Sequence, residues 1–184
     1  MTSSAAEPFS AGNFQTWLGQ ITLAISEGAD SDVPCGPCSA CCRSSQFILV
    51  ADTDVAARSV IPAELLFAAP GLPAGNHVMG YDTQGHCPMF GEAGCSIYDS
   101  RPQACRTYDC RIFAATGIDV AVDGHAEIAS RVEQWQFELD AAGDVALAAV
   151  RAAADYVTAN AQSLGLEYSA TARALAAIEM ATGR

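Results

Sequence analysis

The chain contains no lysine, because all nine of its basic residues are arginines. A lysine Schiff base and a lysine general base are therefore excluded from its chemistry. Charged residues make up only 16% of the 184 positions, and the formal net charge is -12. No basic run interrupts this acidity, so the chain lacks the electrostatic footprint of a nucleic-acid-binding protein. We expect no nucleic-acid partner.

Long apolar runs are also missing, although 51% of the residues are hydrophobic. No stretch approaches the roughly 18 consecutive apolar residues of a membrane span. The segment that begins at Met1 has neither the basic nor the apolar region of a secretory signal. We therefore expect a cytoplasmic protein without a membrane partner. Thiols stay reduced in that compartment, so clustered cysteines favour metal binding or redox chemistry over structural disulfides.

Cysteine, in contrast, is abundant, with eight residues in a chain of this length. A chain of 184 residues can bury enough apolar surface to fold without disulfides, and we predict a single domain over 1–184. The cysteines form two blocks, Cys35-x2-Cys38-x2-Cys41-Cys42 and Cys87-x7-Cys95-x9-Cys105-x4-Cys110. Cysteines that served as small hydrophobic residues would also occur on the helical flanks, and none does.

The flanks of the chain have helical patterns. Apolar residues recur at helical spacing from Phe14 to Ile25, which predicts an N-terminal helix over about 12–27 that ends at Gly28. A C-terminal helical segment is predicted over about 118–184. Its three helices would follow Ile128, Val132, Trp135 and Leu139, then 144–163, then Tyr168 to Ile178.

The cysteine-cluster core, about 30–115, is rich in Gly, Pro and Ser and is expected to be irregular. Short strands are predicted at 46–50 and, at a sheet edge, at 77–81. Short helices are predicted over about 53–60 and 62–69, and from Ser100 onward. The expected fold is mainly α with short β segments, an irregular metal-organised cysteine-cluster domain packed against flanking helices.

The spacing of the first block is typical of a metal-binding turn. Two residues between Cys35 and Cys38 allow a tight turn to direct both sulfurs at one ion, about 2.3 Å from each. Eight thiolates suffice for two four-sulfur sites, or for one iron-sulfur cluster and another metal. The adjacent Cys41 and Cys42 favour a split between two metals or a bridge in a binuclear centre. The ferredoxin pattern is incomplete here, so a cluster on the first block needs a ligand from the second.

Four arginines, Arg43, Arg101, Arg106 and Arg111, lie within four residues of a cysteine. We expect them to surround the site, lower the pKa of the thiols and offset the negative charge of metal thiolates. His86 and Asp109, each beside a cysteine, are weaker candidates for ligands or for hydrogen-bond partners of ligands.

The cysteine pattern resembles a known family. It combines Cys35-x-x-Cys38-x-x-Cys41-Cys42 with Gly94-Cys95-Ser-Ile97-Tyr98-Asp99-Ser-Arg101-Pro102-x-x-Cys105-Arg106-x-Tyr108-x-Cys110. Together these segments resemble the YkgJ-type cysteine-cluster family (CxxCxxCC), described as zinc- or iron-chelating, over about 30–115. The resemblance implies bacterial cytosolic proteins that bind metal through the eight cysteines, Cys35, Cys38, Cys41, Cys42, Cys87, Cys95, Cys105 and Cys110.

Three functions remain open. The first is a metal-binding protein for zinc or iron, including an iron-sulfur cluster, with a structural or metal-handling role. The second is an enzyme that uses an iron-sulfur cluster or thiolate-bound metal for redox or methyl transfer. A related cluster in flagellin lysine methylases suggests this, but no Gly-rich adenosylmethionine fingerprint occurs here. The third is a thiol-disulfide protein based on Cys35-Gly-Pro-Cys38. No catalytic residue, metal identity or protein partner is assigned.

Overall fold

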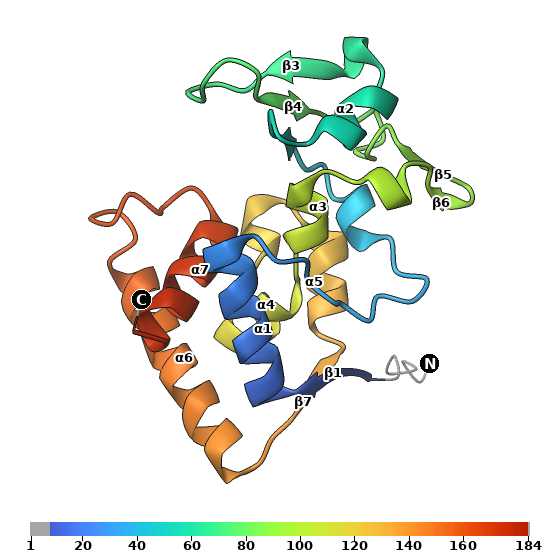
Figure 1. Ribbon diagram of the computed structural model, residues 1–184. Coiled ribbons are helices and arrows are strands. Elements are labelled where there is room, and N and C mark those ends of the chain that lie inside the picture. The colour runs from blue at the N-terminus through green and yellow to red at the C-terminus, as the bar shows by residue number, and fades with distance from the viewer. Residues whose placement is uncertain (1–7, 184) are drawn as a thin grey trace.

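Helices dominate the computed structural model, which describes residues 8–183 (Figure 1). The chain is 47% helical and 12% strand, which confirms the expected mainly α fold with short strands. Within the described range, no helix combines the length and the apolar character that crossing a bilayer requires. The segment Met1–Glu7, which includes the start used for the secretory-signal expectation, and Arg184 lie outside the described residues.

The larger part of the molecule is a helical body around one apolar cluster (Figure 1). Helix α1 (Phe14–Glu27) begins where the Asn13 side chain accepts a hydrogen bond from the Thr16 amide, and Gly28 ends it in the left-handed conformation. The predicted N-terminal helix is thus confirmed. The other helices of the body are α4 (Arg111–Thr116), α5 (Ala126–Val132), α6 (Ala141–Ala159) and α7 (Ala170–Ala181). The largest buried side chains of the cluster are those of Phe14, Trp17, Phe113, Ile128, Val150 and Ile178.

Two strands far apart in the sequence pair in parallel beside α1. They are β1 (Phe9–Asn13) and β7 (Trp135–Glu138), and Phe9 lies opposite Trp135 with ring centroids 6.2 Å apart. The helix predicted through Trp135 and Leu139 therefore ends at Val132, and the prediction is wrong beyond that residue. Pairing with β1 imposes the extended conformation, and a pattern local to 128–139 does not contain that partner.

The smaller part of the molecule is built on a three-stranded antiparallel sheet with helix α2 (Val55–Val60) beside it (Figure 1). The strands β2 (Ile48–Val50), β4 (His77–Met79) and β3 (Leu66–Ala68) lie in that order. The predicted strand at 77–81 therefore exists, but at the centre of the sheet instead of its edge. The helix predicted over 62–69 is wrong, because a single 3-10 turn leads into β3, whose backbone pairs with β4.

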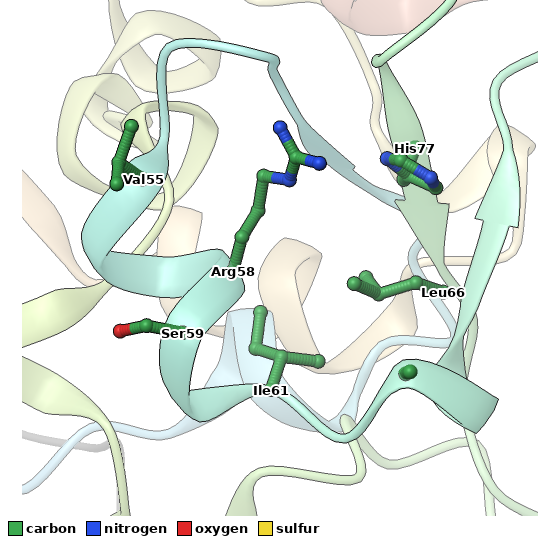
Figure 2. Close-up of a pocket in the computed structure, with 7 residues that line it drawn as sticks. Val55, Arg58, Ser59, Ile61, Leu66 and His77 are labelled. Carbon is green, nitrogen blue, oxygen red and sulfur yellow. The ribbon is translucent and has the colours of Figure 1, made fainter.

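Two surface hollows lie away from the cysteines. One, of about 410 Å³, has Arg58 and His77 across from each other above the apolar side chains of Ile61 and Leu66 (Figure 2). The other, of about 380 Å³, lies over α1 beside Ala146 and Thr182. No cysteine lines either hollow.

The cysteine-bearing segments lie between the helical body and the sheet part. The first block ends in a 3-10 turn (Ala40–Arg43), and the second contains the hairpin of β5 (Phe90–Gly91) and β6 (Gly94–Cys95). Helix α3 (Gln103–Thr107) carries Cys105 and has Pro102 at its N-cap position, two residues later than the cap expected at Ser100. The sheet part has its own apolar cluster, formed by Val50, Ala57, Ile61, Met79, Cys87 and Ile97.

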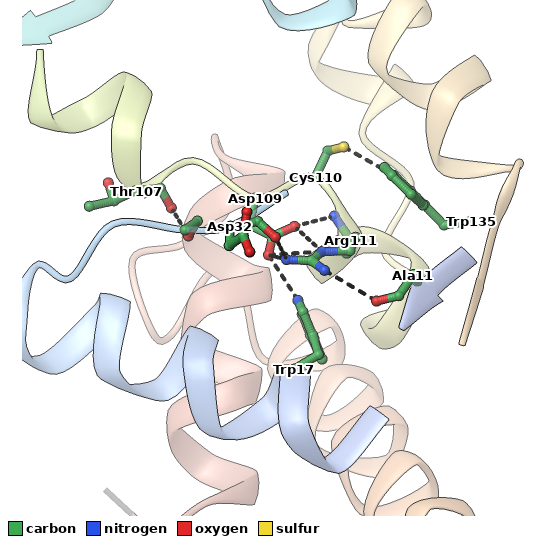
Figure 3. Close-up of polar contacts among 9 residues, drawn as sticks. Ala11, Trp17, Asp32, Thr107, Asp109, Cys110, Arg111 and Trp135 are labelled. Carbon is green, nitrogen blue, oxygen red and sulfur yellow. Dashed lines mark hydrogen bonds and ion pairs between the residues drawn. The ribbon is translucent and has the colours of Figure 1, made fainter. Parts of the chain in front are cut away.

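A buried ion pair fixes the backbone around Cys110 (Figure 3). Arg111 donates to both carboxylate oxygens of Asp109, with an Nη2–Oδ2 distance of 2.7 Å, and the two side chains are only 5% and 2% exposed. The Trp17 indole donates to the same carboxylate at 2.9 Å. The guanidinium also donates to the carbonyls of Ala11 and Asp32. The pair thus connects β1, α1, the first cysteine loop and α4.

Replacement of Asp109 by asparagine leaves the Arg111 guanidinium buried without its counter-ion. We expect the free energy of unfolding to fall by roughly 3–5 kcal/mol, as measured by urea denaturation at equal metal content. The exposed pair of Arg43 and Glu127, 3.2 Å apart, provides the matched control. Glu127→Gln should cost less than about 1 kcal/mol. Equal losses in the two variants would contradict the role given to the buried pair.

Candidate metal centre

The eight cysteines are all reduced and divide between the two apolar clusters. Cys38 and Cys110 pack against the cluster of the helical body, and Cys35 interacts electrostatically with both. We call these three the helix-side thiols. The sheet-side thiols are Cys42, Cys87, Cys95 and Cys105. The first three belong to the sheet cluster, and the charges of Cys87 and Cys95 act on Cys105.

Cys41 lies between the two groups. It is the only cysteine with an exposed side chain, and its charge acts on Cys35 of the helix-side group and on Cys87 and Cys105 of the sheet-side group. Its neighbour Cys42 donates a hydrogen bond to its sulfur. The sequence predicts that this adjacent pair divides between two metals or bridges a binuclear centre, and the position of Cys41 is compatible with either arrangement.

Local backbone structure brings the two blocks together. The Cys38 amide donates to the Cys35 carbonyl at 3.0 Å across the Gly-Pro turn, and Gly36 there has a φ of 54°. The Cys87 amide donates to the Cys42 carbonyl at 2.8 Å, which joins the second block directly to the first. A ligand set drawn from both blocks therefore needs no rearrangement of the fold.

Burial keeps most of these thiols protonated in the metal-free protein. It raises the pKa of Cys35 to about 11, and the pKa values of Cys105 and Cys110 to about 12. Cys41 is the exception, because the hydrogen bond from Cys42 lowers its pKa to about 7, while the same bond raises the pKa of Cys42. A metal ion that binds here must displace several protons.

The arginines near the cysteines in sequence are mostly engaged with carboxylates. Arg43 pairs with Glu127 at 3.2 Å, Arg106 with Asp30 at 2.6 Å, and Arg111 with Asp109. Arg101 instead stacks on the Tyr98 ring, 3.6 Å from its centroid, and its charge lowers the pKa values of Cys41 and Cys105. Arg101 is thus the one of the four arginines that has no ion pair among the described residues, and its charge acts on the thiols.

The sequence reasoning missed Arg131, which lies on α5, well beyond the last cysteine. Its side chain is buried and donates to the Cys35 carbonyl at 3.4 Å, and its charge opposes in small part the rise in the pKa of Cys35 that burial causes. A signal was present, since Arg131 interrupts the apolar stripe of Ile128 and Val132 on one helix. A charged side chain on the buried face of a helix is expected to have a polar or charged partner.

Trp135 is also close to a thiol. Its indole nitrogen donates to the Cys110 sulfur at 3.2 Å (Figure 3). Asp109 and His86, the candidate ligands that lie beside cysteines in the sequence, have other partners. Asp109 is taken by Arg111 and Trp17, and the ring of His86 packs against Phe90 with centroids 6.0 Å apart.

The donor set fits zinc or iron in kind, because both metals accept thiolate ligands. Over residues 8–183, however, no three His, Cys, Asp or Glu side chains are already arranged to hold an ion. The sulfur atoms of the helix-side or sheet-side thiols therefore have to approach one another when an ion binds. Metal sites that form only when the ion is present behave in this way.

Comparison with known proteins agrees with this donor chemistry. Residues 34–130 match the CxxCxxCC family model, described as "Putative zinc- or iron-chelating domain", and this range contains all eight cysteines. No curated protein and no solved structure shows significant similarity to the chain. Because the match extends over more than half of the sequence and the matched cysteines gather in the fold, the chain belongs to the CxxCxxCC family of zinc- or iron-chelating domains.

Proposed function

We propose that this protein binds zinc or iron through its eight cysteines, at two sites, in a structural or metal-handling role. One observation carries the proposal. Cysteines from both blocks, far apart in sequence, form two groups of reduced thiols, one against the apolar cluster of the helical body and one at that of the sheet part. Such a grouping of thiols in two blocks of metal-binding spacing is typical of a metal centre.

The proposed ligands of one site are the four sheet-side thiols, Cys42, Cys87, Cys95 and Cys105. The other site would use the helix-side thiols with Cys41 as the fourth ligand. The charge of Cys41 acts on Cys35 and equally on Cys105 of the sheet-side group, so Cys41 is assigned to the helix-side site because that site otherwise has only three thiols. The division also separates the adjacent Cys41 and Cys42, whose side chains rarely reach one ion without strain.

A structural or metal-handling role follows from the closed coordination. Four protein thiolates leave no open position for a substrate on a tetrahedral ion. Neither of the two surface hollows described above has a cysteine in its lining. A cytoplasmic location is part of the proposal, because eight free thiols persist only in a reducing compartment.

The thiol-disulfide alternative has less support. A reactive dithiol needs a thiolate stabilised at low pKa, whereas burial raises the pKa of Cys35 to about 11. The enzyme alternative requires an ion with an open coordination position, and the metal content of the protein tests it.

Anaerobically purified protein should contain about two metal equivalents per chain by elemental analysis, one for each four-sulfur site. A colourless protein with zinc supports the proposal as stated. A brown protein with absorption near 400 nm that bleaches on reduction would instead indicate an iron-sulfur cluster. Less than about one tightly bound equivalent in both aerobic and anaerobic preparations would overturn metal binding.

Serine variants test the division of ligands. Cys105→Ser should remove the sheet-side metal and leave the other, so that metal content falls by about half; Cys110→Ser should do the reverse. The double variant should bind none. Ser39→Ala, next to Cys38, is the matched control and should retain full content. If either single variant loses all metal, the two sites are not independent and the division is wrong.

The pKa values predict an alkaline instability that metal removes. In the folded metal-free protein the pKa values of Cys35, Cys105 and Cys110 are about 11 to 12, whereas the ordinary pKa of a cysteine thiol is 9.0. The unfolded chain therefore loses these protons first as pH rises, and its stability relative to the folded state increases. At pH 10 each such thiol should lower the free energy of unfolding by about 1 kcal/mol.

Urea denaturation at pH 8 and pH 10, with and without bound zinc, measures this effect. Metal-loaded protein should lack the decrease, because the ion has already displaced the protons. Equal pH dependence in both forms would show that these thiols are not ligands.

A further inference from the structure

We propose that Arg131 and Trp135 are positioning residues for the helix-side thiols, Arg131 as the counter-ion of their thiolates and Trp135 as a hydrogen-bond donor to the Cys110 sulfur. Together they would fit that site to a divalent or trivalent cation and disfavour a monovalent one. The inference rests on the proposed function and assigns roles to two residues beyond the segment that matches the family, residues 34–130.

Arg131 is a buried cation without an anionic partner among the described residues. Its exposed fraction is 7%, and no carboxylate there lies within ion-pair distance. Glu127, one turn earlier on α5, pairs with Arg43, and Asp109 pairs with Arg111. Burial of an uncompensated charge is costly, so a negative charge beside it is expected in the functional state. The thiolates that form when metal binds supply that charge.

Packing holds the guanidinium in place beside Cys35. Its central carbon lies 3.6 Å from the centroid of the Phe9 ring and 4.5 Å from that of Trp135. Phe9 and Trp135 face each other across the β1–β7 pair, so the strand pairing creates the aromatic slot. One nitrogen donates to the Cys35 carbonyl at 3.4 Å, while the buried Nε has no hydrogen-bond partner. The group is therefore positioned but not fully satisfied.

Trp135 contributes to the same site through its nitrogen. The indole N–H can only donate, and it lies 3.2 Å from the Cys110 sulfur. A donated hydrogen bond stabilises the thiolate and fixes the direction of its lone pairs. Since the same ring also covers Arg131, one side chain orients both the ligand and its counter-ion.

The charges favour a divalent or trivalent ion over a monovalent one. The pair of Asp109 and Arg111 is neutral as a unit, so Arg131 leaves one positive charge near the helix-side thiols. With the four proposed thiolates and Arg131, a divalent ion leaves a net charge of -1 and a trivalent ion leaves none. A monovalent ion on the same thiolates leaves one more uncompensated negative charge.

The test uses the full chain and the variants Arg131→Gln and Trp135→Phe, with Zn²⁺ and Co²⁺ as probes. Competition against a chromophoric chelator measures zinc affinity, and each variant should bind about 10- to 100-fold more weakly at one of the two sites. Arg131→Lys should recover part of the loss because it restores the charge. Arg43→Gln, which removes an exposed arginine of an ion pair, is the matched control and should bind as the wild type does.

A spectroscopic readout separates positioning from folding. In Co²⁺-loaded Trp135→Phe, the sulfur-to-cobalt charge-transfer band should move to lower energy, because the thiolate has lost a hydrogen bond. The shift should vanish when Trp135→Phe is combined with Cys110→Ser. Wild-type affinity and an unshifted band in Trp135→Phe would overturn the role of Trp135. Wild-type affinity in Arg131→Gln would overturn that of Arg131.

Two further outcomes are also decisive. If wild-type protein binds neither probe, the proposed function itself fails. If Arg131→Gln does not fold, as judged by circular dichroism, then Arg131→Lys replaces it. A folded lysine variant that binds zinc as weakly as a Cys110→Ser variant would overturn the counter-ion role, because its charge is retained.

Discussion

The buried ion pair between Asp109 and Arg111 is the interaction on which the arrangement of this protein depends. It flanks Cys110, and its hydrogen bonds reach α1 through Trp17 and the first cysteine loop through the Asp32 carbonyl. Because a charge without its partner is so unfavourable in this environment, the three segments have little freedom to separate. The helix-side thiols thus gather by a contact that involves none of their sulfurs.

Much of the fold could be predicted from local pattern. The helices α1, α6 and α7 follow apolar periodicity and clear caps, and each was expected near its observed position. The errors fall where a distant partner decides the conformation. Trp135 continues the helical spacing of Ile128 and Val132, yet β1 holds it in a strand. Likewise β3 pairs with β4, and no local signal in 62–69 reveals that pairing.

The candidate site shows the same division. Cysteine spacing identified the metal chemistry, and the family match agrees with it. Sequence proximity was a poor guide to the surrounding charges, however, because Arg43, Arg106 and Arg111 have carboxylate partners. Arg131 approaches Cys35 only because α5 packs against the first cysteine turn, and that contact is a property of the folded chain.

The parallel pairing of β1 with β7 has a consequence for the order of synthesis. Phe9 leaves the ribosome about 125 residues before its partner Trp135, an interval of roughly 6 to 25 s at about 5–20 residues per second. All eight cysteines emerge within that interval. The eight cysteines are therefore synthesised before the aromatic slot around Arg131 can form, and pairing of the two strands completes that slot last.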